Sequence, residues 1–194
     1  EVALEEDVIT EEPSVEQRVE QNKEEKYMIA EYAASLIKPG DFVYIDAGTT
    51  TGYMLNFLKN SKSVFVTNAV THAKKLALQG NKVILIEGEL KGSTEALVGG
   101  YAAASLKKFH FTKGFFGTNG LTKKAGFTTP DTSEALVKNK AMEQCKECYV
   151  LADQSKFDKI SPVTFQQFGR ATIITESKPE GYMECENIIV VRGN

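Results

Sequence analysis

Short apolar runs alternate with segments of helical periodicity from Lys23 to the end of the chain. A first helix is predicted from Lys23 and ends at Lys38-Pro39-Gly40, a strong stop signal. Apolar runs bounded by polar or glycine residues predict strands, and the spacing between them predicts helices. The predicted strands are 42–46, 63–67, 82–86, 111–117, 148–152, 172–175 and 188–192, and the later helices are 50–59, 69–79, 100–108 and 131–146.

Continuous apolar strands separated by helices are typical of parallel strands that are buried on both faces of their sheet. The predicted fold class is therefore α/β and Rossmann-like, with a mostly parallel sheet and helices on both faces. Residues 1–22 are acidic and contain Pro13, so we expect a linker or arm there. Residues 23–194 are predicted to form one domain, preceded in the intact protein by something further.

The net charge of −3 hides an asymmetry along the chain. Residues 1–26 hold ten acidic and three basic side chains, so the remainder is mildly cationic. That balance suits an anionic small molecule better than a nucleic acid, which needs a denser basic patch. No apolar run approaches the roughly 18 residues of a membrane helix, and the acidic start is unlike a signal peptide. With only three cysteines, the composition favours a cytoplasmic protein without membrane contact.

Polar residues follow the carboxyl ends of four predicted strands. Ligands of open α/β sheets bind beyond these ends. Carboxylates and amides there suit sugar hydroxyls, whereas backbone N–H groups and lysine suit a phosphate. These residues are Asp46, Gly48, Thr49, Thr50 and Thr51 after strand 42–46, Thr67 and Asn68 after 63–67, Gly117, Thr118, Asn119 and Gly120 after 111–117, and Asp153, Ser155 and Lys156 after 148–152.

Each of these residues also has a purely structural interpretation. A carboxylate after a strand can cap the next helix or turn, and a Thr-Asn pair can do the same. Asn-Gly is a common turn dipeptide, and a loop lysine is usually solvated. The coincidence of four polar strand ends favours a binding pocket over these alternatives, which apply to Asp46, Asp153, Thr67-Asn68, Asn119-Gly120 and Lys156.

Two further groups leave alternatives open. Glu134 and Lys138 are four residues apart on a predicted helix, so they form either a surface ion pair or part of the pocket mouth, and Asp131 is expected to cap that helix. Cys145 and Cys148 have CxxC spacing but lack nearby metal-ligand partners, which favours buried thiols. No nucleophile motif or P-loop occurs, so we predict no catalytic residue, cofactor or metal.

Six short segments follow one another along nearly the whole chain. They are Glu25-Lys26 with Ile29-Ala30, Ile45-Asp46-Ala47-Gly48-Thr49-Thr50, Val66-Thr67-Asn68, Gly117-Thr118-Asn119-Gly120, Gly126-Phe127-Thr128 and Leu151-Ala152-Asp153-Gln154-Ser155-Lys156-Phe157. Together these segments resemble the C-terminal sensor domain of DeoR-family bacterial transcription regulators, and the resemblance is greatest to repressors of phosphotransferase operons for fructose or lactose. Many family members have Gly-Gly after the third strand, whereas this chain has Glu87-Gly88.

The resemblance implies the fold shared by ribose-phosphate isomerases, glucosamine-phosphate deaminases and CoA transferases. It implies a homo-oligomer that binds a phosphorylated sugar, with fructose 1-phosphate as the first candidate. Operator DNA would be bound only through an N-terminal winged helix-turn-helix that this chain lacks. The implied ligand contacts are Asp46, Gly48, Thr49, Thr50, Asn68, Asp153 and Lys156, with Lys26, Glu134 and Lys138 as weaker ones and Glu87 left unassigned.

The sequence thus favours the effector-sensing domain of a repressor of sugar catabolism. The alternative is a sugar-phosphate isomerase or deaminase, which needs a carboxylate base beside the C1–C2 bond of the substrate. Asp46, Asp153 or Glu134 could serve as that base, but no second acid–base group stands at a convincing spacing. An oligomerisation scaffold without a ligand is a third possibility.

Overall fold

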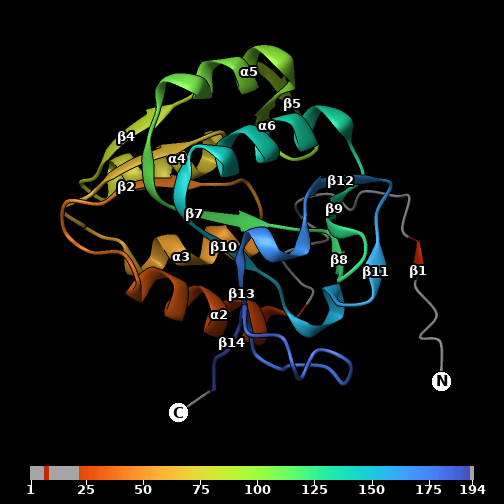
Figure 1. Cartoon of the computed structure of the whole chain (residues 1–194). Coiled ribbons are helices and arrows are strands. Elements are labelled where there is room, and N and C mark those ends of the chain that lie inside the picture. Colours follow the sequence, from red (N-terminus) through yellow and green to blue (C-terminus); the bar gives the residue numbers. More distant parts are fainter. Residues whose placement is uncertain (1–6, 9–21, 193–194) are drawn as a thin grey trace.

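A seven-stranded parallel sheet forms the centre of the molecule (Figure 1). The computed structural model describes residues 7–8 and 22–192. The strand order β14-β13-β10-β7-β2-β3-β4 places the first strand of the sheet in sequence near its middle, so the chain winds outward in both directions. The strands are β2 (Phe42–Ile45), β3 (Val64–Thr67), β4 (Lys82–Leu85), β7 (Phe111–Gly117), β10 (Cys145–Leu151), β13 (Thr172–Thr175) and β14 (Ile188–Val190).

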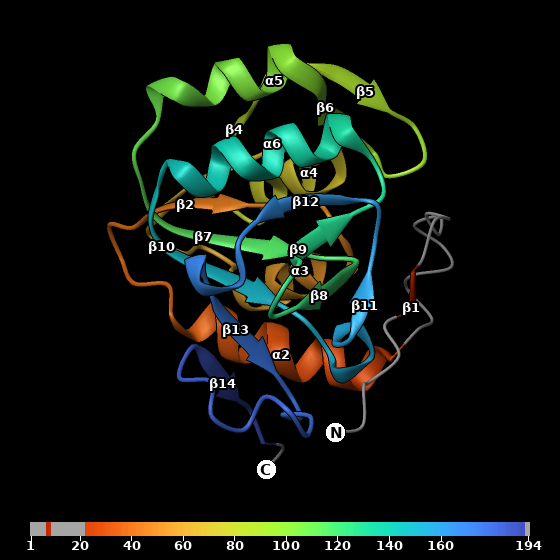
Figure 2. The ribbon, with the colours of Figure 1, turned by 45° about the vertical axis from the view of Figure 1, so that its right-hand side comes forward.

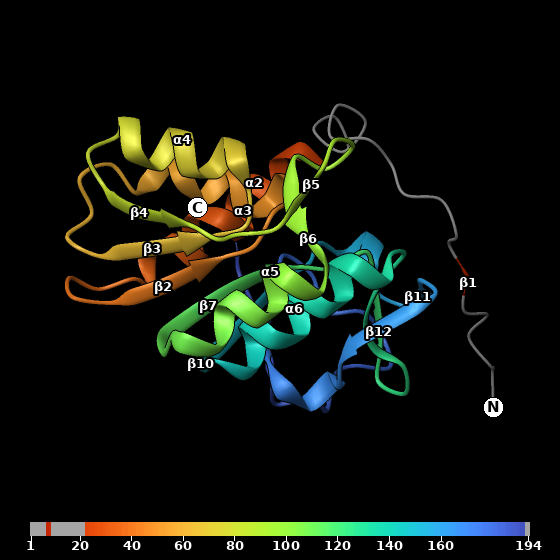
Figure 3. The same cartoon turned by 90° about the horizontal axis from the view of Figure 1, so that it is seen from above.

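Helices cover both faces of this sheet, as Figure 3 shows from above. One buried core joins the sheet to α2 (Lys23–Ser35), α3 (Thr49–Met54) and α4 (Val70–Leu78). A second core joins the other face to α5 (Gly99–Ser105) and α6 (Thr132–Glu143). Among the described residues, no helix has the length and apolar character that crossing a membrane requires. Short 3₁₀ turns are η1 (Leu55–Phe57), η2 (Leu106–Lys108), η3 (Gln154–Lys156) and η4 (Phe168–Arg170).

Smaller sheets lie at the carboxyl edge of the large sheet, where Figure 2 shows β8, β9 and β12 beyond the end of β7. Two of these strands form a tight antiparallel pair, and the third strand returns from much later in the chain. A separate hairpin follows β4 and contributes a loop to the same edge. The strands are β5 (Glu89–Lys91), β6 (Ala96–Val98), β8 (Gly120–Thr122), β9 (Gly126–Thr129) and β12 (Val163–Gln166), while β1 (Asp7–Val8) pairs with β11 (Lys159–Ile160).

The α/β fold predicted from the hydrophobic pattern is confirmed, and three local differences are informative. The small antiparallel sheets were not predicted, because strands of three or four residues carry too little pattern. The helix predicted at 131–146 ends at Glu143, because Cys145 pairs with Phe111 in the large sheet. The helix predicted at 50–59 is α3 followed by a 3₁₀ turn. The predicted arm at 1–22 falls almost entirely outside the described residues.

Candidate functional site

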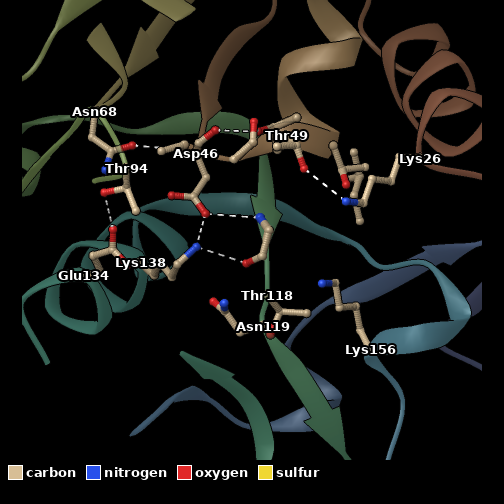
Figure 4. A pocket seen from close by; sticks show the side chains of 16 residues that line it. Lys26, Asp46, Thr49, Asn68, Thr94, Thr118, Asn119, Glu134, Lys138 and Lys156 are labelled. Carbon is tan, nitrogen blue, oxygen red and sulfur yellow. Dashed lines mark hydrogen bonds and ion pairs between the residues drawn. The ribbon is translucent and has the colours of Figure 1, made fainter. Parts of the chain in front are cut away.

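A cavity of about 670 Å³, its open mouth included, lies at the carboxyl ends of β2, β3 and β7 (Figure 4). Its walls come from all the layers of the fold, because α2, α3, α6 and the hairpin loop after β5 each contribute a side chain. Most of the site residues predicted from the sequence line it. The lining residues are Lys26, Asp46, Ala47, Gly48, Thr49, Thr50, Thr51, Asn68, Thr94, Gly117, Thr118, Asn119, Glu134, Lys138, Leu151 and Lys156.

A buried ion pair between Asp46 and Lys138 forms the floor of the cavity. Asp46 is 1% exposed, and its Oδ2 atom also accepts a hydrogen bond from the Gly117 backbone N–H at 3.1 Å. Lys138 Nζ donates in addition to the Gly117 carbonyl oxygen at 3.1 Å. Because a buried charge is costly unless it is paired, this three-way contact fixes α6 against the ends of β2 and β7.

The turn from Gly48 to Thr51 forms one wall of the cavity. Gly48 has φ of 141°, a backbone conformation that side chains with a Cβ rarely adopt. Thr51 Oγ1 donates to the Asp46 carbonyl oxygen at 2.7 Å, so its hydroxyl holds the turn closed. Asn68 Oδ1 accepts from the Ala47 N–H at 3.1 Å and fixes the same turn from β3. This wall is therefore held in place by hydrogen bonds within the domain itself.

Two lysines reach the cavity from the same side in Figure 4. Lys26 lies on the buried stripe of α2, in register with Ile29 and Ala30, and is only 2% exposed. Its Nζ donates to Thr49 Oγ1 at 3.4 Å. Lys156 enters from η3 and is half-buried. These two cations give one side of the cavity a positive potential, which suits an anionic group.

The opposite side of the cavity carries Glu134, held by two neighbours. Thr94 Oγ1 donates to Glu134 Oε1 at 2.8 Å, and Lys91 Nζ lies 3.8 Å from Glu134 Oε2. The interpretation of Glu134 and Lys138 as a surface ion pair is therefore wrong, because both are buried and each has another partner. Asp131 caps α6 as expected, since its carboxylate accepts from the Ser133 N–H at 3.0 Å.

Two predicted residues lie beside the cavity without lining it. The Thr67 hydroxyl donates to the Ile45 carbonyl oxygen at 2.6 Å and accepts from the Ala69 N–H at 3.1 Å, so it links β2 to β3. Gly120 packs against β11, where a Cβ atom would overlap the carbonyl oxygen of Lys159. A structural role accounts for both residues. Glu87 is exposed and also lies outside the lining.

Asp153 also lies outside the lining, next to Lys156. Its Oδ1 atom accepts from the Ser155 N–H at 3.0 Å, so the capping interpretation is confirmed. Asn22 Nδ2, at the start of α2, lies 3.3 Å from the same oxygen. The other carboxylate oxygen, Oδ2, is buried and has no hydrogen-bond partner within residues 7–8 and 22–192. An unsatisfied acceptor at this position leaves a ligand contact open as a prediction.

Sequence reasoning missed three lining residues as site candidates, namely Thr94, Ala47 and Leu151. Thr94 lies in the loop between β5 and β6, away from any strand end of the large sheet, so no pattern indicated it. Ala47 and Leu151 are apolar and carry no chemical signal. Thr118, noted among the polar residues that follow β7, does line the cavity.

Behind the turn, His72 on α4 contacts Thr51, with 3.2 Å between Nε2 and Oγ1. Burial lowers the pKa of His72 to about 4, so the imidazole is neutral at physiological pH. Among the described residues, no group of three or more histidine, cysteine or acidic side chains is arranged to hold a metal ion. The Cys145 and Cys148 thiols are both free and buried, as expected.

The C-terminal sensor domain of DeoR matches residues 21–177 of this sequence, which is most of its length. The chain belongs to the DeoR sensor-domain family. Among curated relatives, it is 45% identical over 186 residues to an uncharacterised HTH-type transcriptional regulator FruR of Bacillus subtilis. The alignment covers 93% of this chain and 74% of that relative. The family identified from the sequence motifs is thereby confirmed.

A lactose phosphotransferase system repressor of Staphylococcus aureus is a second relative of this sensor domain, 34% identical over 153 residues. That alignment covers 77% of the chain and 61% of the repressor. Among solved structures, ribose 5-phosphate isomerase A of Methanocaldococcus jannaschii superposes with a TM-score of 0.53 at 14% identity. The superposition covers 71% of this chain and 55% of the isomerase, and it shows a shared fold.

Proposed function

We propose that this sensor domain binds a phosphorylated sugar in the cavity beyond β2, β3 and β7. The observation that carries the proposal is the polarity of the cavity. Lys26 and Lys156 stand on one side, and Asp46, Asn68 and Glu134 stand on the other. A sugar phosphate needs both kinds of group, cations for its phosphate and carboxylates or amides for its hydroxyls.

The phosphate is placed between the Gly48–Thr51 turn and the two lysines, where backbone N–H groups, hydroxyls and two positive charges converge. The sugar ring then extends towards Glu134 and Asn119, over the Asp46–Lys138 pair. The unsatisfied Oδ2 atom of Asp153 is a further acceptor for a sugar hydroxyl, provided that η3 shifts towards the ligand. Fructose 1-phosphate is the specific ligand that we propose to test first.

The regulatory role follows from the same binding step. Relatives of this domain are transcriptional regulators of the helix-turn-helix type, so we propose that the intact protein is a cytoplasmic repressor of sugar catabolism. The ligand changes its affinity for operator DNA through a DNA-binding domain outside this chain. For that to occur, the ligand must bind one arrangement of a homo-oligomer or of the linker better than another.

Isothermal titration calorimetry with a panel of phosphosugars tests the proposal. The Lys156→Met variant should bind the selected phosphosugar at least tenfold more weakly than the wild type, because a charge-assisted contact to phosphate is lost. Lys124→Met is the matched control, since Lys124 is exposed and does not line the cavity. Equal affinity of both variants, or no binding by any phosphosugar, would contradict the proposal.

A further inference from the structure

A second cavity, of about 770 Å³ with its mouth included, lies on the other side of the Gly48–Thr49 turn. Part of it lies against the first turn of α4, and part against α3 and η1. None of the residues predicted from the sequence as ligand contacts belongs to it alone. Its lining residues are Gly48, Thr49, Gly52, Tyr53, Asn56, Ala69, Thr71, His72, Lys75, Thr94 and Glu95.

The two cavities are neighbours that share a wall. Gly48, Thr49 and Thr94 line both of them. This wall is fixed on the α4 side, because the Val70 N–H donates to the Glu95 carbonyl oxygen at 3.1 Å. It is fixed on the other side by the hydrogen bond from Thr94 to Glu134. The Gly48–Thr49 turn and Thr94 therefore lie between the two cavities.

The lining of the second cavity is balanced in charge. Lys75 and Glu95 are its two charged groups, and Lys75 Nζ donates to Asn56 Oδ1 at 2.8 Å. His72 is neutral because burial lowers its pKa. The buried lining residues are Ala69, His72 and Thr94, and exposed Asn56 and Thr71 offer amide and hydroxyl groups. Such a lining accommodates an uncharged ring that bears hydroxyls, whereas a second phosphate would face Glu95.

Resting on the proposed function, we infer that the second cavity holds an uncharged second sugar ring, so that the domain prefers disaccharide phosphates to their monosaccharide parents. The phosphorylated ring occupies the first cavity, and the second ring lies between α4 and η1. Its hydroxyls are bonded by Asn56, Thr71 and Lys75. The added contacts should raise affinity by at least tenfold.

The experiment compares trehalose 6-phosphate and sucrose 6-phosphate with glucose 6-phosphate, and lactose 6-phosphate with galactose 6-phosphate, by calorimetry. Thr71→Phe places a ring in the second cavity from an exposed position, where it does not disturb the core. Lys74→Phe is the matched control, because Lys74 is exposed on the same helix and does not line the cavity. Support requires a disaccharide phosphate that binds at least tenfold more tightly than its parent, with that ratio lost in Thr71→Phe and kept in Lys74→Phe.

Three results would overturn the inference. One is that no disaccharide phosphate binds more tightly than its parent. Another is that the preference survives Thr71→Phe. The third concerns fructose 1,6-bisphosphate. If its affinity exceeds that of fructose 1-phosphate by a larger factor than any disaccharide phosphate gains over its parent, and if Lys75→Met abolishes this excess, the second cavity binds a phosphate instead of an uncharged ring. Failure of the proposed function looks different, since no phosphosugar of any size would bind.

Discussion

Lys138 on α6 forms an ion pair with Asp46 at the end of β2, although the two residues are 92 positions apart in the sequence. The pair is nearly inaccessible to water, with side-chain exposures of 10% and 1%. It joins a helix on one face of the sheet to the strand end from which the Gly48–Thr51 turn starts. Both the stability of the domain and the shape of the cavity therefore depend on this contact.

Removing one member of this pair should destabilise the domain strongly. In Lys138→Met the Asp46 carboxylate stays buried without its cation, which costs about 3–5 kcal/mol. Lys140→Met is the matched control, because Lys140 lies on the same helix and pairs with the more exposed Glu143 at 2.9 Å. In urea unfolding, the control should lose less than about 1 kcal/mol of its free energy of unfolding. Similar losses in both variants would show that the Asp46 pair is not buried in solution.

The stability of the domain should fall on mild acidification because of His72. The pKa of His72 is lowered by burial to about 4 in the folded state, against about 6.5 in the unfolded chain. Between these values the unfolded state binds more protons, so stability is lost as the pH falls from about 6.5 to about 4, by up to about 3 kcal/mol.

Urea unfolding as a function of pH measures this effect. The His72→Gln variant should show a shallower dependence over this range than the wild type. The other histidine, His110, is exposed, so His110→Gln serves as the control and should keep the wild-type slope. An unchanged slope in His72→Gln would assign the acid sensitivity to other groups.

Two glycine-to-alanine substitutions should change the stability of the domain in opposite directions. Gly48→Ala should destabilise the domain by about 1–3 kcal/mol, because its φ of 141° is strained for alanine even though the nearest atom, Thr51 Oγ1, is 3.6 Å from the added Cβ. Gly100→Ala, in α5 with open space around its Cβ position, should stabilise the domain by about 0.5–1 kcal/mol. Differential scanning calorimetry measures both. Equal shifts of the melting temperature in the two variants would contradict this prediction, because the turn at Gly48 would then relax to accommodate alanine.

The domain should not turn over sugar phosphates. Of the carboxylates that line the cavity, Asp46 is bound by Lys138 and the Gly117 N–H, and Glu134 is bound by Thr94. A general base for isomerisation must be able to reach a substrate proton, so carboxylates already held by donors are poor candidates. A coupled assay with ribose 5-phosphate and glucose 6-phosphate measures this directly. Steady-state turnover that Glu134→Gln abolishes would restore the isomerase alternative.

The large sheet could be predicted because each of its strands is a continuous apolar run followed by a helical pattern. The strand-end residues Asp46 and Asn68 could be predicted for the same reason, since parallel strands bring their carboxyl ends to one edge. The role of Thr94 could not be predicted, because it reaches the cavity through a hairpin whose placement depends on long-range packing. The burial of Lys138 could not be predicted either, since its spacing from Glu134 is equally typical of a solvent-exposed helix face.

The first turn of α2 is attached at the rim of the cavity, through Asn22 to Asp153 and Ser155 and through Lys26 to Thr49. The start of α2 is therefore bonded both to η3 and to the first residue of α3. Under the proposed function, a ligand that shifts η3 or Lys26 acts directly on the start of α2. Such a shift would reach α2 without any rearrangement of the seven-stranded sheet.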